Sequence, residues 1–430
     1  MRNTRTRLTR WLPTLLLLAA CGPEPVEPTD PEQPTQPEPP KPTYHTGPIT
    51  QSETWRAANN PHVVSLGVMV GGSAVPTLTL EAGTVVRFEA GATLFVGVGK
   101  DAGALRSEGT AAAPVLLTAN ADAPKPGHWK GVFVSGNAQV GSHLAHTTIE
   151  YAGNALADDE DALIPAAGLN LMGALGDDAP TGRPAVLDHV TIQKSQAHGL
   201  VMLGMSLGTG SSALTLRDNG KSPLVVSPNE LGSLPADITL SGNAVSTVQL
   251  MSGLVRDSQT WPNLGVPYLL SSPLKSVAPL ISVGATSKPT LTLSAGTEFQ
   301  MPTDAAFFVG GGSDESGTLI AMGTAQAPIR FVADATTAAP GHWSGLAFSA
   351  NTGSKLDHVL VSHAGSPLFG SLGGGGLNLL GDPGPTITHT TLRHSSGCGI
   401  ATLLESQTDY TQATLGNTFA DNADKAQCVK

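Results

Sequence analysis

Residues 75–88, VPTLTLEAGTVVRF, return almost unchanged as residues 288–301, KPTLTLSAGTEFQM. In both copies apolar side chains alternate with polar ones, as Leu78 alternates with Thr77 and Thr79. A period of two is typical of a β-strand that buries one face. A small turn, AGT, leads to a second run of the same kind. The stretch therefore predicts short strands joined by tight turns, and it predicts them twice.

Other phrases return with the same order. PGHWKGVFVSG at residues 126–136 matches PGHWSGLAFSA at 340–350, and AAGLNLMG at 166–173 matches GGGLNLLG at 374–381. A shorter motif recurs within each copy as well, as LAHTTI, LDHVTI, LDHVLV and ITHTTL, at residues 144–149, 187–192, 356–361 and 387–392. Repetition at two scales predicts a solenoid whose coils stack on one another.

These phrases resemble the right-handed parallel β-helix proteins, in particular bacterial surface lipoproteins with modules of the pattern LTL.AGT…GT…AP…PG.W.G. The resemblance covers residues 48–430. It implies an all-β, right-handed parallel β-helix solenoid of the pectate-lyase-like kind, with three short strands in each coil. We expect two modules of about 200 residues each, at 48–245 and 246–430, the second with a C-terminal cap. The phrases are typical of an architecture and specify no activity.

The first residues predict an export signal. Four arginines within MRNTRTRLTR precede the apolar run WLPTLLLLAAC, which is too short to span a bilayer. Residues 18–21, LAAC, resemble the bacterial lipobox, which implies cleavage after residue 20 and attachment of lipid to Cys21. The residue after the cysteine is Gly22, and in lipoproteins of this kind an Asp at that position favours retention at the inner membrane. We therefore expect an anchor in the outer membrane, on its periplasmic or its surface face.

Residues 21–47 are rich in proline, which blocks helix and sheet and favours an extended spacer. We interpret them as a tether behind the anchor; a disordered leader is the alternative.

The chain has a net charge of −11 and only 13% charged residues, so no basic surface indicates binding of nucleic acid. Of three cysteines, Cys398 and Cys428 remain for a disulfide, as expected outside the cytoplasm, with two free buried thiols as the alternative.

Two of the five tryptophans, Trp129 and Trp343, occupy the PGHW phrase. If the strand that follows is regular, Val132 and Val134 face the interior, whereas Trp129 lies on the other face beside Gly131. We predict an indole that shields the backbone over this glycine. The alternative is an outward pair of rings that stacks on sugars, which makes both tryptophans candidates for ligand contact.

Histidines recur at fixed places of the short motif. His146, His189, His358 and His389 share one place, and His363 and His394 share a second. Stacked coils would bring equivalent imidazoles to about 4.8 Å, which predicts polar ladders sensitive to pH. A transition metal is the alternative, although carboxylate or cysteine partners at ligand spacing are missing from the pattern. Asp188 and Asp357 precede a histidine, but strand neighbours point to opposite faces, so we interpret them as surface residues.

An acidic insertion provides the remaining candidates, Asp158, Asp159, Glu160 and Asp161, together with Asp177 and Asp178. Hard oxygen ligands of this kind could hold Ca²⁺. With Arg183 nearby, the set resembles in composition the sites of β-helix pectate lyases, without matching their motifs. A solvated loop is the alternative.

Two functions follow as hypotheses. The first is a non-catalytic surface lipoprotein with a structural, adhesive or glycan-binding role, whose partners are the membrane and a polysaccharide or another surface protein. The second is a lyase or glycoside hydrolase acting on an acidic polysaccharide, and a metal-holding surface protein is a weaker third. No catalytic residue and no cofactor other than Ca²⁺ is indicated.

Overall fold

The computed structural model describes residues 41–99, 101–136, 142–156, 164–173, 185–272, 277–311, 315–349, 353–368, 372–403 and 408–429. All of them belong to one compact unit, Pro40–Lys430, and the other unit is Met1–Pro39. Within the described residues the fold is all-β. The sole helical elements there are three short 3-10 turns, η1 (Ala57–Asn59), η2 (Leu231–Ser233) and η3 (Ala413–Leu415), and no helix there is long and apolar enough to cross a membrane.

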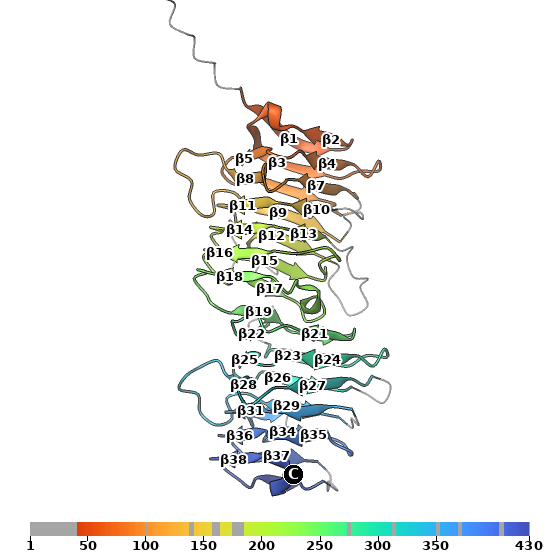
Figure 1. Cartoon of the computed structure of the whole chain (residues 1–430), viewed down its shortest axis with the longest axis vertical. Coiled ribbons are helices and arrows are strands. Elements are labelled where there is room, and N and C mark those ends of the chain that lie inside the picture. Colours follow the sequence, from red (N-terminus) through yellow and green to blue (C-terminus); the bar gives the residue numbers. More distant parts are fainter. Residues whose placement is uncertain are drawn as a thin grey trace, which may run out of the picture. The chain divides into compact units, whose positions relative to one another are not determined.

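Within each module the strands stack in three columns, in which each strand pairs with its equivalents in the neighbouring coils of that module (Figure 1). Column one contains β2 (Glu53–Trp55), β4 (Thr77–Leu80), β7 (Ala104–Glu108), β10 (His143–Ala145) and β13 (Val186–Asp188), then β21 (Gln259–Trp261), β24 (Thr290–Leu293), β27 (Thr318–Met322), β30 (Lys355–Asp357) and β35 (Thr386–Thr388). Column two contains β5 (Val85–Phe88), β8 (Val115–Ala119), β11 (Thr147–Glu150), β14 (Thr191–Gln193), β16 (Thr215–Arg217) and β18 (Thr239–Ser241), then β22 (Tyr268–Ser271), β25 (Glu298–Met301), β28 (Ile329–Ala333), β31 (Val359–Ser362), β36 (Thr391–Arg393) and β38 (Thr418–Ala420).

Column three contains β6 (Thr93–Val96), β9 (Gly131–Ser135), β12 (Ala167–Met172), β15 (His198–Leu203), β17 (Leu224–Val226) and β19 (Val248–Met251), then β20 (Gly253–Val255), β23 (Leu280–Val283), β26 (Ala306–Val309), β29 (Gly345–Phe348), β34 (Gly375–Leu379), β37 (Cys398–Thr402) and β39 (Gln427–Val429). Two longer strands, β1 (Thr43–Ile49) and β3 (His62–Val70), run through columns two and three. The pairings between these described strands are parallel, and the short hairpin of β32 (Pro367–Leu368) and β33 (Leu372–Gly373) is antiparallel. The predicted all-β parallel β-helix is therefore confirmed.

The columns change partners where the two modules meet. β19 pairs with β17 on one side and with β22 on the other, so column three of the first module continues into column two of the second. The stack runs past residue 245 without a gap between coils. At the junction, column two of the second module therefore lies against column three of the first.

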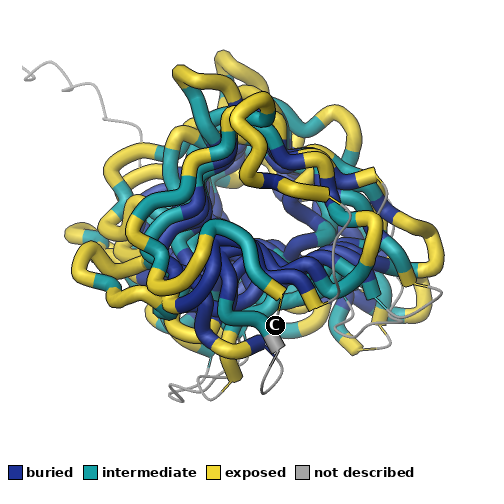
Figure 2. The backbone as a smooth tube through the Cα atoms, turned by 90° about the horizontal axis from the view of Figure 1, so that it is seen from below, coloured by how far each residue is buried: buried dark blue, intermediate teal, exposed yellow. Residues whose placement is uncertain are grey.

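The core follows the period of two that the sequence displays. Leu78 and Leu80 are fully buried, and Thr77 and Thr79 between them are half-buried. Figure 2 shows the buried residues on the inner side of the coils and the exposed residues mainly on the outer loops. Burial of one row from each coil against the next row makes a continuous apolar interior, which is the main stabilising contribution in such a stack.

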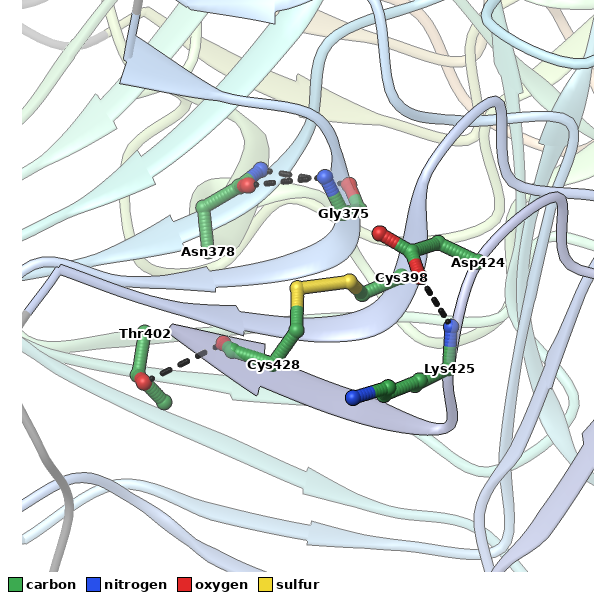
Figure 3. The surroundings of a disulfide bond; sticks show 7 residues. All are labelled: Gly375, Asn378, Cys398, Thr402, Asp424, Lys425 and Cys428. Atoms are coloured by element: carbon green, nitrogen blue, oxygen red, sulfur yellow. Dashed lines mark hydrogen bonds between the residues drawn. A yellow bond between two sulfur atoms is a disulfide. The ribbon is translucent and has the colours of Figure 1, made fainter. Parts of the chain in front are cut away.

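Each end of the stack is closed by specific contacts. At the first coils His45 stacks on the indole of Trp55 with ring centroids 3.9 Å apart, and its Nε2 lies 2.9 Å from Nδ1 of His62. At the last coils the predicted disulfide is confirmed, since Cys398 of β37 is bonded to Cys428 of β39 (Figure 3). The bridge joins the final two coils, where the edge of the sheet is otherwise held by hydrogen bonds, among them one from Thr402 Oγ1 to the Cys428 carbonyl at 3.2 Å.

Candidate functional site

The two PGHW tryptophans lie in the core. Trp129 and Trp343 are both fully buried, and each indole Nε1 donates to a backbone carbonyl, that of Glu150 or that of Ser362, at 2.9 Å. The interpretation that Trp129 lies on the outer face is therefore wrong. A fully buried ring has no face free for a sugar, so neither tryptophan remains a candidate for ligand contact.

The reason for this error is local geometry. β9 begins at Gly131, whose φ of +122° redirects the chain, so Trp129 precedes the strand and does not follow its alternation. Gly345 has the same role at the start of β29, with a φ of +96°. Val132 and Val134 are buried as expected. The phrase is therefore a corner that turns a tryptophan into the core in each module.

The histidine ladders are confirmed. Ring centroids lie 4.4 Å apart for His146 and His189, and 4.7 Å for His358 and His389. The histidines at the second place of the motif stack as well, with the ring centroids of His363 and His394 4.9 Å apart. Burial first, and then the charge of His394, lowers the pKa of His363, which is the direction expected for crowded imidazoles.

These histidines lie at bends between strands. All six have positive φ, between +40° and +62°, a region where histidine is more frequent than most residues. The first place separates column one from column two, and the second follows column two. The short motif is therefore two strands joined at a left-handed corner, and this changes where its side chains point.

Because the histidine is at a bend, the acid before it can reach the imidazole. Asp188 Oδ1 lies 2.7 Å from His189 Nδ1, and Asp357 Oδ1 lies 2.8 Å from His389 Nδ1 in the next coil. The expectation that Asp and His point to opposite faces, and that carboxylate partners are missing, is wrong. Each module thus has a corner cluster of two histidines and one aspartate: His146, Asp188 and His189, and Asp357, His358 and His389.

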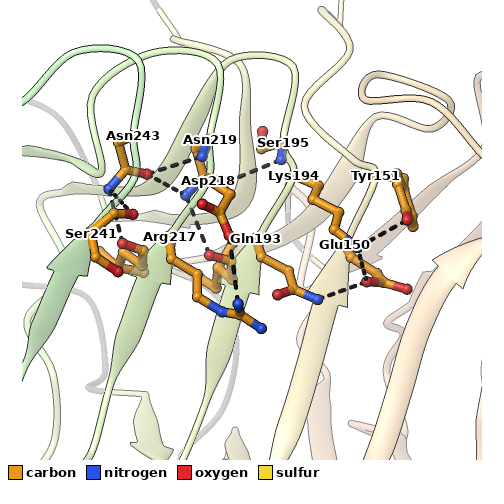
Figure 4. Close-up of polar contacts among 12 residues, drawn as sticks. Glu150, Tyr151, Gln193, Lys194, Ser195, Arg217, Asp218, Asn219, Ser241 and Asn243 are labelled. Carbon is orange, nitrogen blue, oxygen red and sulfur yellow. Dashed lines mark hydrogen bonds and ion pairs between the residues drawn. The ribbon is translucent and has the colours of Figure 1, made fainter.

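A ladder of polar side chains covers the outer side of column two in the first module (Figure 4). Glu150 accepts hydrogen bonds from Thr118 at 3.0 Å and Gln193 at 2.8 Å, and its carboxylate lies 3.7 Å from Lys194 Nζ. Further along the stack Arg217 pairs with Asp218 at 3.5 Å. These residues take corresponding positions in successive coils, so the face repeats with the coil. The sequence contains no repeated signal for this face, because the equivalent positions carry different residue types.

The second corner differs between modules. Tyr151 and Lys194 have positive φ and take the places that His363 and His394 take in the second module. Lys194 Nζ donates to the Tyr151 hydroxyl at 3.0 Å, and the amine also lies 4.9 Å from the centre of the Tyr151 ring. One corner position thus supports two kinds of contact between coils, an imidazole stack or a cation over a phenol ring.

Several predicted residues lie outside the described part of the chain. They are Cys21, Asp158, Asp159, Glu160, Asp161, Asp177, Asp178 and Arg183. Lipid attachment at Cys21 and calcium binding at the acidic residues stay predictions.

Comparison with known proteins agrees with the coil geometry. Residues 47–163 match the family model described as a pectate-lyase like beta helix domain. Residues 47–163 are therefore similar to the pectate-lyase-like β-helix domains. No curated protein and no solved structure shows significant similarity to the chain. The match confirms the β-helix that the repeated phrases predict, but β-helix domains are an architecture and do not by themselves distinguish a catalytic, structural or binding role.

Proposed function

We propose that this protein is a lipid-anchored, exported β-helix that binds a polysaccharide or another surface protein without cleaving it. The anchor is the lipobox-like cysteine, Cys21, and the proline-rich residues 21–47 are the tether. The binding surface is the polar face on column two of the first module. The outer membrane is the proposed location.

The state of Glu150 supports a binding role over a catalytic one. A general acid or a nucleophile needs a carboxyl that is free to act on the substrate. The Glu150 carboxylate instead accepts from Thr118 and Gln193 and lies beside Lys194, so its lone pairs hold neighbouring coils together. Around it the face exposes the charged side chains of Lys194, Arg217 and Asp218 in successive coils, which suits contact with the polar groups of an extended polymer.

A glycan array with the purified chain tests this proposal, and exposed arginines offer a matched pair of variants. Arg217 lies on the polar face, 3.5 Å from Asp218, whereas Arg106 lies in column one, 3.6 Å from Glu108; both are about half exposed. Surface ion pairs of this kind contribute little to stability. We expect R217A to weaken retention on the bound glycan and R106A to leave it unchanged. Equal effects of the two variants, or no glycan retained, would count against this face.

The anchor has a separate test. Metabolic labelling with a palmitate analogue should mark the chain, and C21A should abolish the label and release the protein from the membrane fraction. Unlabelled wild-type protein would contradict the proposed anchor while leaving the binding face untouched.

An acidic-polysaccharide lyase or hydrolase is the second candidate, because residues 47–163 match a domain described as pectate-lyase like. Its catalytic groups would come from the acidic residues 158–161, 177 and 178 with Arg183. Release of new chain ends that disappears in D177N/D178N would favour this candidate.

A further inference from the structure

The corner cluster of the second module contains an unusual contact. Nδ1 of His358 lies 3.1 Å from Asp357 Oδ2, yet the two atoms are not aligned for a hydrogen bond. This nitrogen is out of reach of solvent and has no other hydrogen-bond partner among the described residues. The other carboxylate oxygen, Oδ1, already accepts from His389 and from Thr388.

Chemistry limits what can satisfy this nitrogen. If Nδ1 carries its proton, the N–H is buried and poorly directed, which costs free energy. If Nδ1 carries its lone pair, that pair faces an anionic oxygen, and two electron-rich atoms at this distance repel each other. A cation bound by both atoms removes either penalty. A metal ion that takes nitrogen and oxygen ligands fits this arrangement.

The spacing of the ligand atoms agrees with a metal. In each corner cluster one ligand atom from every residue can be chosen so that the three lie within 4.8 Å of one another. Bonds of 2.0–2.2 Å to zinc place tetrahedral ligand atoms about 3.3–3.6 Å apart. Asp357 approaches the two imidazoles with different oxygens, Oδ1 at 2.8 Å from His389 Nδ1 and Oδ2 at 3.1 Å from His358 Nδ1, so an ion shared by all three residues requires the stacked rings to turn toward it. His389 is 55% exposed, and its ring can therefore make that adjustment.

Both clusters also have support behind the carboxylate. Thr388 Oγ1 donates to Asp357 Oδ1 at 2.8 Å, and Ser212 Oγ donates to Asp188 Oδ1 at 2.7 Å. Each hydroxyl comes from the next coil along the stack. Hydrogen bonds of this kind fix the orientation of metal ligands and are a regular part of metal sites.

We propose that Asp357, His358 and His389 bind a divalent late transition metal ion of the zinc type, and that His146, Asp188 and His189 form a second site of the same composition, in which the aspartate lies on the later of the two coils. With three protein ligands each, the sites keep a coordination position open at the exposed corner, for water or for an oxygen of a bound molecule. This assignment goes beyond the proposed function and does not depend on it.

The chain contains its own control for this proposal. His363 and His394 stack as closely as the other pairs, at 4.9 Å, but no third histidine, cysteine or carboxylate ligand lies within reach of both among the described residues. Stacking alone should not hold the ion, whereas stacking with an aspartate should. A ladder that served only to join coils would not distinguish the two cases.

Isothermal titration of the purified, untagged full chain with Zn²⁺ tests the proposal. Relative to wild type, D357N should bind one equivalent of zinc fewer, D188N should also bind one fewer, and the double variant should bind two fewer. H394A should bind as much zinc as wild type. Each aspartate substitution should weaken the zinc affinity of its own site by at least about tenfold, the smallest effect usual for metal-site residues.

Thermal melting without metal shows whether the variants fold. If D357N does not fold, H389Q replaces it. Co²⁺ absorption typical of tetrahedral nitrogen and oxygen coordination should follow the same pattern. Zinc uptake that the aspartate variants leave unchanged, or that H394A abolishes, would overturn the assignment.

Discussion

The indole of Trp129 lies flat against the ring of Phe88, with centroids 3.8 Å apart and planes 4° apart. Phe88 ends β5, and Trp129 comes from the corner that precedes β9, so the contact joins two coils through the core. Both residues are fully buried. The phrase that repeats in the sequence is therefore a packing element.

Truncation of this ring should destabilise the first module. W129A removes the stack with Phe88 and the hydrogen bond to the Glu150 carbonyl, and we expect a loss of about 3–5 kcal/mol in the free energy of unfolding. Urea denaturation followed by fluorescence of the remaining tryptophans measures it. L66A is the control, because Leu66 is 81% exposed, and its midpoint should match wild type. Equal stability of W129A and wild type would contradict a core position.

Gly131 should tolerate no side chain. A Cβ there would lie 2.5 Å from the Ala167 carbonyl oxygen, in a backbone with φ of +122°, whereas Gly91 has φ of +75° and open space around it. We expect G91A to cost about 1 kcal/mol, the cost of a left-handed residue alone, and G131A to cost at least about 3 kcal/mol because the backbone must also move. Denaturation midpoints of the two variants give the comparison. If G131A proved as mild as G91A, the tight contact between β9 and β12 would be refuted.

Loss of the disulfide should loosen the C-terminal coils and leave the others intact. The bridge closes a loop with a sequence separation of 30 residues, and on the chain-entropy model it contributes about 3–4 kcal/mol. In a solenoid each coil contacts its neighbours, so the effect stays local. Hydrogen exchange in C398S/C428S should rise in β37 and β39 and remain unchanged in β4 to β9. Uniform exchange along the chain would argue against this local stacking.

Stability should depend on pH through one buried acid. Glu230 is 3% exposed, and burial raises its pKa from 4.5 to about 7. Between these values the folded chain holds a proton that the unfolded chain releases, so the contribution of Glu230 to stability is largest below pH 4.5 and falls by about 3 kcal/mol as the pH rises to about 7. Burial lowers the pKa of His198 to about 4, and this acts in the opposite direction, so the Glu230 contribution is the difference between wild type and a variant without that carboxyl.

E230Q should remove this fall in stability, because glutamine does not titrate. Chemical denaturation across pH 4–8 compares E230Q with wild type and with E108Q, whose carboxylate is about half exposed. The E230Q variant should exceed wild type in stability above pH 7, and E108Q should follow wild type. Parallel curves for E230Q and wild type would mean that Glu230 is ionised in the fold.

The sequence allowed the architecture to be predicted because its signals are local and repeated. Alternation in residues such as Leu78 and Leu80 identifies strands, and repetition of a phrase identifies coils. Stacking of the histidines followed, since equivalent positions in neighbouring coils must lie one strand spacing apart. The disulfide followed from there being one pair of cysteines besides Cys21.

The corners could not be predicted in the same way. A histidine in left-handed conformation looks, in sequence, like the middle of a strand, and the Asp–His contact depends on that bend. The direction of Trp129 depends likewise on the φ of Gly131. Such angles are set by the pairing of coils distant in sequence, so alternation within one segment does not reveal them.

The most direct test of the central claim, binding without cleavage, is a search for new chain ends. The purified chain is incubated with acidic and neutral polysaccharides, and reducing ends and unsaturated uronate ends are counted in the supernatant while bound polymer is measured on the protein. We predict retention of a polysaccharide with no chain ends above those of a protein-free control. Chain ends that accumulate in proportion to protein, and that vanish in E150Q or in D177N/D178N, would contradict it.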